Sequence, residues 1–188
     1  MRKFNVNLIA VLCAAALSFQ LHATTTEKVD PVSAIKVNWV NPEKYSDIRP
    51  ATGTRKSYQE RVIKGLDKVW ADLATKLPVG YSMEVSIKDV DLAGDVNHMY
   101  TQSGDRIRVI KDIFIPRINF SYTLLDKNKT VVAEEKELKL KDMGFMTRLN
   151  VSRADRPLEH ERAMLQRWYK DTIQPAVVSH QQNIAKAG

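Results

Sequence analysis

The chain has 188 residues and a formal net charge of +7 at pH 7. That length is sufficient for one compact domain with its own core, and the basic residues are dispersed, which excludes a nucleic-acid-binding arm. The positive excess either favours contact with anionic material or serves solubility alone.

Residues 1–23 have the layout of a secretory signal peptide. Two basic residues precede a short apolar stretch, and Ala23 supplies the small residue expected before a cleavage site. Because Gln20 and His22 interrupt the apolar stretch, a membrane anchor is the less favoured alternative. We therefore expect an exported protein that is cleaved after Ala23, resides in the periplasm and has no membrane span in its mature form.

The single cysteine, Cys13, lies inside the apolar stretch of the signal peptide. Leu12 precedes it where a lipoprotein signal has a small residue, so we do not expect acylation. The mature chain then has no cysteine and can form neither a disulfide nor a thiolate metal site. Its stability must come from the burial of apolar side chains.

The mature part begins with a polar leader at residues 24–32. A strand is expected at 35–39, where apolar and polar residues alternate. A helix is expected at 57–77, because its apolar residues, including Trp70, recur at spacings of three and four and form one stripe. Pro78 follows as a stop signal.

Three strands are expected next. The first spans 81–92, and its apolar parity changes at Asp89. The second spans 107–124, with a β-bulge expected at Pro116 because the apolar set moves by one position there. The third spans 131–140 and has a charged middle, which is typical of a solvated or edge strand.

A last helix is expected at 156–174, with Trp168 on its apolar face and Pro175 as its stop signal, followed by a loose tail at 177–188. These elements predict an α+β fold in a single domain at 33–176. The simplest arrangement is a two-layer sandwich, in which an antiparallel β-meander carries two helices on one face in the order β-α-β-β-β-α.

Four stretches of the chain carry a family resemblance. They are VNWVNPEKYSDIR at residues 37–49, DVDLAG at 89–94, RIRVIKDIFIPRI at 106–118 and LQRWY at 165–169. They resemble a bacterial exported family known as domain of unknown function 3016. The resemblance implies an exported, single-domain bacterial protein, and it implies no activity and no functional residue because none is established for the family.

Sequence motifs of catalysis and cofactor binding are absent. The chain contains no G-x-S-x-G, no phosphate-binding loop, no H-E-x-x-H and no dinucleotide-binding glycine pattern. His98, His160 and His180 have no metal-motif spacing and are expected at the surface. We therefore expect no cofactor and no metal.

The best polar constellation combines three aspartates with two arginines: Asp89, Asp91, Asp95, Arg106 and Arg108. Asp89 and Asp91 share one face of a strand, and an antiparallel return would place the arginines opposite them. The clustered carboxylates allow a calcium-type site, whereas the arginines allow a purely structural set of ion pairs. The balance of charge favours the ion pairs, so we expect Asp89 and Asp91 to bond with Arg106 or Arg108.

Two further features keep alternatives open. Arginines gather near the last helix and form either an anion-binding face or a solvated helix face; they are Arg148, Arg153, Arg156, Arg162 and Arg167. The apolar run at 143–146 either packs beneath that helix or contacts a partner.

These observations favour a non-enzymatic periplasmic module that binds an envelope component, with anionic material as the suggested partner. One alternative is a hydrolase-like enzyme that uses the aspartate cluster, and a deep pocket around Asp89 or Asp91 with a strongly shifted pKa would favour it. Another is an accessory subunit that docks onto an envelope complex through an exposed strand edge. The sequence does not specify an oligomeric state.

Overall fold

The computed structural model describes residues 34–187, except 102, 104 and 149–155. Its strands are β1 (Ile35–Trp39), β2 (Ser82–Asp91), β3 (Asp95–Asn97), β4 (Ile107–Val109), β5 (Arg117–Leu125) and β6 (Val131–Lys141), and its helices are α2 (Arg55–Ala74), α3 (Phe145–Arg148), α4 (Glu159–Trp168) and α5 (Gln174–Ala187). The signal peptide, the leader and residue 188 lie outside the described residues, so the division into segments stays a prediction.

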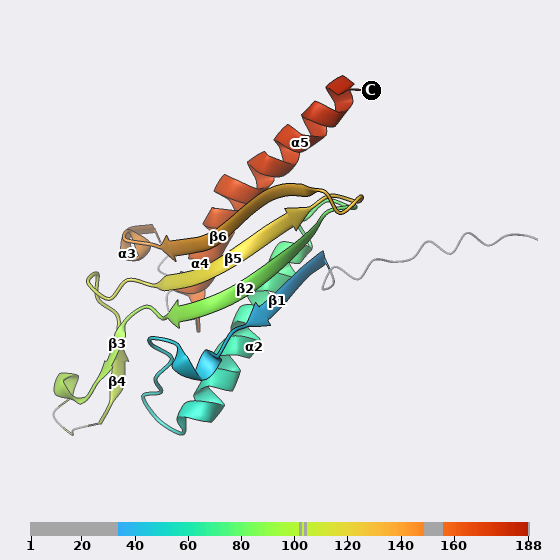
Figure 1. Ribbon diagram of the computed structural model, residues 1–188. Coiled ribbons are helices and arrows are strands. Elements are labelled where there is room, and N and C mark those ends of the chain that lie inside the picture. Colours follow the sequence, from blue (N-terminus) through green and yellow to red (C-terminus); the bar gives the residue numbers. More distant parts are fainter. Residues whose placement is uncertain (1–33, 102, 104, 149–155, 188) are drawn as a thin grey trace, which may run out of the picture.

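A four-stranded sheet in the order β1-β2-β5-β6 forms one layer, and α2 and α4 cover the same face of it (Figure 1). The expected two-layer α+β architecture and the antiparallel meander of β2, β5 and β6 are confirmed. The sheet is nevertheless mixed, because β1 pairs with β2 in parallel. Parallel neighbours need a crossover connection, which α2 supplies between β1 and β2.

The core lies between the sheet and the helices. Trp70 of α2 and Trp168 of α4 are 2% and 5% exposed, so their expected burial is confirmed. The two indoles meet edge to face with ring centroids 6.0 Å apart, and each packs in the same way against Phe120 of β5. This aromatic cluster joins both helices to the centre of the sheet.

The strand expected at 107–124 is two strands in different places. Residues 107–109 form β4, which pairs with β3 in a separate two-stranded ribbon, and β5 starts at Arg117. The bulge expected at Pro116 is therefore wrong: the change of parity marks the passage from the ribbon to the sheet. Pro116 precedes β5, where it need not donate to the ladder. In β2, the register does shift between Ile87 and Asp89, where the parity changes.

Strand β6 is an edge strand, as its charged middle indicates. It pairs only with β5, and its residues 134–137 are exposed. A row of charged side chains on an edge opposes pairing with another chain.

The last helix does not end at Pro175. Helix α4, a single π-helical turn (Tyr169–Ile173) and α5 follow one another without a break, so the tail expected at 177–188 is helical as far as Ala187. In the wider turn the Gln174 N–H donates to the Tyr169 carbonyl, five residues back. A wider turn accommodates a proline that lacks an N–H and would crowd an ordinary α-helical carbonyl.

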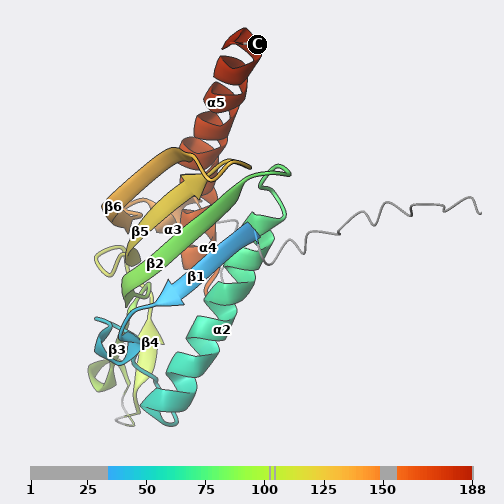
Figure 2. The same ribbon diagram turned by 45° about the vertical axis from the view of Figure 1, so that its right-hand side comes forward.

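The ribbon and α5 extend from opposite ends of the molecule (Figure 2). No helix of the described part of the chain is long and apolar enough to cross a membrane.

Candidate binding pocket

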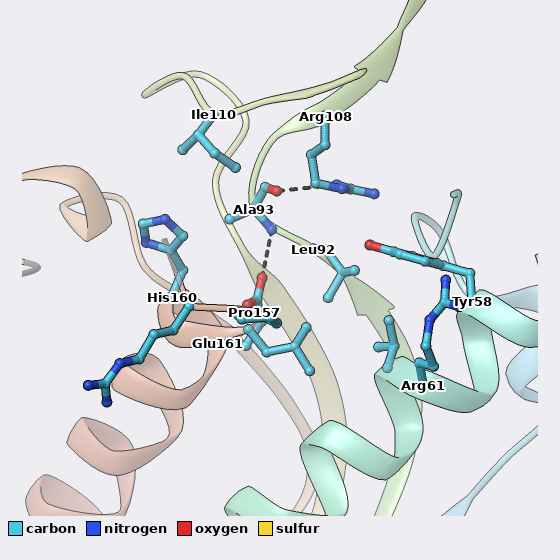
Figure 3. A pocket seen from close by; sticks show the side chains of 12 residues that line it. Tyr58, Arg61, Leu92, Ala93, Arg108, Ile110, Pro157, His160 and Glu161 are labelled. Carbon is cyan, nitrogen blue, oxygen red and sulfur yellow. Dashed lines mark hydrogen bonds between the residues drawn. The ribbon is translucent and has the colours of Figure 1, made fainter. Parts of the chain in front are cut away.

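A cavity of about 380 Å³ lies between α2, the start of α4 and the chain that links β2 to the ribbon (Figure 3). Its apolar wall includes Val62, Leu92, Ile110, Pro157 and Leu158, and its polar groups are Tyr58, Arg61, Arg108, Arg156, His160 and Glu161. Mostly apolar walls with a few polar groups are typical of small-molecule sites, and the volume falls in their range.

A close approach between α2 and the start of α4 forms one side of the cavity. Gly65 of α2 faces Leu158, and a Cβ at that position would lie 2.5 Å from the Leu158 Cδ1. Leu158 itself has a φ of 60°, a left-handed conformation that is uncommon for a leucine. The missing side chain of Gly65 therefore allows Leu158 to pack against α2 and to line the cavity.

The floor of the cavity is held by a buried carboxyl group. Glu161 is 3% exposed, and its Oε1 accepts a hydrogen bond of 2.7 Å from the backbone N–H of Ala93. Burial raises the pKa of the Glu161 carboxyl, and the Ala93 hydrogen bond opposes that rise. The bond connects α4 to the turn after β2, where Gly94 has a φ of 84° that favours glycine.

Arg108 of the ribbon closes another side of the cavity. Its Nη1 donates to Asp47 Oδ2 at 3.0 Å and to the carbonyls of Ala93 and Gly94, and its Nη2 donates to the Arg49 carbonyl. These bonds hold the ribbon, the turn after β2 and the segment at 46–49 together. Its Nε is buried and has no acceptor among the described residues.

Tyr58 and Arg61 extend from the first turns of α2. The guanidinium carbon of Arg61 lies 5.7 Å from the centre of the Tyr58 ring, within the range of a cation–π contact. Within residues 34–148 and 156–187, as far as the structure describes them, no carboxylate pairs with Arg61. In Figure 3 the Tyr58 hydroxyl points toward the Arg108 guanidinium.

The histidines differ from the surface positions expected for them. His160 is partly buried beside the cavity; its ring meets Phe145 edge to face at 4.8 Å, and its Nδ1 has no partner among the described residues. His180 is also partly buried, with its Nδ1 3.0 Å from the Tyr81 hydroxyl. Only His98 is exposed as expected.

The expected pairing of the aspartate cluster is wrong. Asp91 pairs with Arg117 at 2.6 Å, and Asp89 accepts hydrogen bonds of 2.7 Å from the backbone N–H and the hydroxyl of Ser46. Arg106 is exposed and has no ion pair within the described residues. The reason is topological: β4 pairs with β3, so Arg106 and Arg108 do not lie opposite β2, whose antiparallel neighbour is β5.

Sequence reasoning missed the acid that Arg108 binds. Asp47 is almost fully buried and pairs with both Arg108 and Arg49, and Arg49 also reaches Asp95 at 3.2 Å. Asp47 lies in a loop without periodicity, so its only sequence signal was its place in the first of the four family stretches.

A second cavity of about 220 Å³ is lined by two of the three aspartates of the expected cluster and by Asp47. Asp47, Asp91 and Asp95 line it together with Arg49 and Arg117. Burial raises the pKa of Asp91, and the hydrogen bond from Arg117 opposes that rise. No group of three or more histidine, cysteine, aspartate or glutamate side chains in the described part of the chain is arranged to hold a metal ion.

A family model described as "Protein of unknown function (DUF3016)" matches residues 33–171. The chain belongs to this family. The match extends from β1 to the π-helical turn and includes every residue that lines the cavity, and it confirms the resemblance expected from the sequence. No curated protein and no solved structure matches the chain significantly.

The arginines near the last helix divide into two groups. Arg148 and Arg167 both bind the buried carboxylate of Asp142, and Arg162 pairs with Asp72. Arg156 is exposed at the cavity and has no ion pair among the described residues, whereas Arg153 lies outside them.

The apolar run at 143–146 packs in part beneath the last helix. Phe145 is buried against His160 of α4, whereas Met143 and Met146 remain exposed.

Proposed function

We propose that this protein is an exported, non-enzymatic module that binds a small molecule of the cell envelope in the cavity between α2 and α4. The observation that supports it is the cavity itself, whose apolar walls and few polar groups match the general character of small-molecule sites. The signal-peptide layout of residues 1–23 supports export into the periplasm.

The charges around the cavity support an anionic ligand. Arg61 and Arg156 have no carboxylate partner among the described residues, and Glu161, the acid that lines the cavity, is buried with a raised pKa. A cavity bordered by unpaired cations and a carboxyl group that resists ionisation attracts negative charge.

Export is tested by the processing of the chain. We expect protein from a periplasmic extract to begin at Thr24, because Ala23 is the small residue before the cleavage site. Intact-mass measurement and N-terminal sequencing check this, and a full-length or lipid-modified species in the membrane fraction would contradict it.

Ligand binding is tested with two tryptophan variants. Ile110 lines the cavity and is 37% exposed, so Ile110→Trp should fill the cavity mouth without disturbing the core. Ile184 of α5 is 56% exposed and lines neither this cavity nor the second one, so Ile184→Trp is the matched control. After incubation with envelope extract, native mass spectrometry should find a bound small molecule on the wild type and on the control, and not on Ile110→Trp. Equal occupancy of all three proteins, or none on the wild type, would refute the proposal.

A second candidate is the hydrolase-like enzyme, because Asp91 lines the second cavity and burial raises its pKa. The hydrogen bond from Arg117 holds this carboxylate in an ion pair. This favours a structural role for Asp91, so we prefer the binding module to the enzyme. Hydrolysis of p-nitrophenyl acetate or p-nitrophenyl phosphate by the wild type, abolished in Asp91→Asn, would reverse that order.

A further inference from the structure

We infer that the cavity selects an amphipathic monoanion, whose oxyacid group binds at Tyr58, Arg61 and Arg108 and whose apolar chain lies against Val62, Leu92 and Leu158. This inference rests on the proposed function and names the class of ligand for the same cavity.

Tyr58, Arg61 and Arg108 each have a hydrogen-bond donor for which the described residues supply no acceptor. The terminal nitrogens of Arg108 bond to Asp47 and to three backbone carbonyls, but its Nε does not. The Tyr58 hydroxyl and the Arg61 guanidinium form no hydrogen bond with any described residue; the guanidinium only stacks on the Tyr58 ring in a cation–π contact. Three donors from two elements thus lack an oxygen acceptor.

The positions of these donors define one corner of the cavity. Figure 3 shows that Tyr58 and Arg61 rise from α2 and that Arg108 descends from the ribbon, with the Tyr58 hydroxyl between them. His160 lies on the other side of Ala93, so it does not belong to this corner. An oxyacid group that enters beside Tyr58 meets Arg61 at the opening and Arg108 behind it.

Charge counting indicates a single negative charge. Arg108 and Arg49 are balanced by Asp47 and Asp95, with which they form three ion pairs. Arg61 remains as the unbalanced cation of this corner; Arg156, the other unpaired arginine of the cavity, precedes α4 and also lines a separate cavity with Glu159 and Arg162, so it is not counted here. One carboxylate or one phosphodiester neutralises Arg61, whereas a dianion such as inorganic phosphate would leave one negative charge unpaired.

The apolar side chains that line the cavity next to these donors favour a ligand with an apolar chain. Val62 of α2 and Leu92 are buried core residues, and Leu158 packs against this core beside Gly65 of α2. Each methylene of a ligand that lies against this wall strengthens binding about fourfold, so an oxyacid without a chain loses most of the available affinity.

Calorimetric titration with four probes tests the inference: decanoate, decanol, dihexanoylphosphatidylglycerol and inorganic phosphate. We expect decanoate or the phosphodiester lipid to bind, decanol to bind at least tenfold more weakly, and inorganic phosphate to bind weakest. The preference between decanoate and the lipid identifies a carboxylate or a phosphodiester as the source of the charge. Affinity should fall as salt is raised.

Three variants locate the binding group. Arg61→Gln removes the unbalanced cation and should weaken binding of the preferred anion about tenfold or more. Tyr58→Phe removes only the hydroxyl and should weaken it about fivefold. Lys68→Gln removes the same charge from an exposed position on α2 outside the cavity, and it should bind as the wild type does.

The failures of the two proposals are distinguishable. Equal affinity for decanol and decanoate, equal affinity of Arg61→Gln and Lys68→Gln, or no binding of any probe overturns the monoanion site. None of these results affects the native mass spectrometry, in which loss of an envelope molecule from Ile110→Trp tests the cavity itself.

Discussion

In the middle of the sheet, Trp70, Phe120 and Trp168 pack edge to face with ring centroids between 5.0 and 6.0 Å apart. At the ribbon end, Arg108 instead bonds to the Asp47 carboxylate and to backbone carbonyls. The first region is close-packed and has no room for a ligand. The second is held by directional bonds that leave a cavity and unused donors beside them, which is why the candidate site lies there.

The aromatic cluster should show the largest effect on stability. Trp70→Ala removes the side chain that contacts both Phe120 and Trp168, and we expect it to lower the free energy of unfolding by about 3–5 kcal/mol. Val79 is 95% exposed, so Val79→Ala is the control and should change stability by less than about 0.5 kcal/mol. Denaturant melts measure both, and a loss below about 1 kcal/mol for Trp70→Ala would show that the cluster is not the main source of stability.

The periodicity of the sequence predicts this aromatic region well. Both tryptophans belong to apolar stripes at helical spacing, and such a stripe specifies the buried face of a helix without knowledge of its partner. The partner itself is a matter of topology. No local pattern states that β1 lies parallel to β2, or that β4 leaves the sheet, because strand pairing depends on contacts far apart in the sequence.

The C-terminal helix shows how packing overrides a local signal. Pro175 is a strong stop signal, yet Ile173 and Val177 on either side of it are both buried in the core. Burying these two side chains stabilises a continuous helix, and the π-helical turn removes the clash that the proline would cause. The polar network at the ribbon end was less predictable still, because Asp47 and Arg49 lie in a loop whose sequence has no period.

The ribbon end should show a smaller effect than the aromatic cluster. Asp47→Asn keeps an oxygen acceptor for Arg108 and removes the charge that pairs with Arg108 and Arg49. We expect a loss of about 1.5–3 kcal/mol, because hydrogen bonds to charged groups are worth that much. Asp112→Asn, at an exposed position of the same region, is the control. Equal stability of the two variants would mean that the network contributes nothing to folding.

The stability of the cavity end should depend on pH through Glu161, whereas the aromatic cluster has no group that titrates. Burial raises the folded-state pKa of Glu161, whereas its unfolded-state pKa is about 4.3. Between these two values the unfolded chain loses the proton and the folded chain keeps it, so stability falls as the pH rises through this window and is constant above it.

Glu161→Gln tests this assignment, because the amide oxygen can still accept from the Ala93 N–H but cannot ionise. The variant should equal the wild type in stability at acidic pH and become the more stable protein as the pH rises above about 4.3. Thermal melts at a series of pH values measure this difference. A gap that does not change with pH would show that Glu161 ionises normally.

The smallest expected effect concerns calcium at the second cavity. Asp91 is paired with Arg117, and Asp47 and Asp95 are paired with Arg49, so a divalent cation would have to displace existing ion pairs. We therefore expect the melting temperature to stay unchanged on adding a chelator or millimolar calcium. Asp91→Ala should lower it slightly, because Arg117 loses its partner at a half-exposed position.

Calcium bound at a true site would raise the stability by an amount that is easy to measure. A cation present at about 100 times its dissociation constant would stabilise the folded protein by roughly 2.7 kcal/mol, a rise in melting temperature that is easily detected. If such a rise occurs in the wild type and disappears in Asp91→Ala, the carboxylates bind a cation. A metal ion, and not arginines, would then hold the polar end of the molecule, whereas the aromatic cluster is held by apolar packing alone.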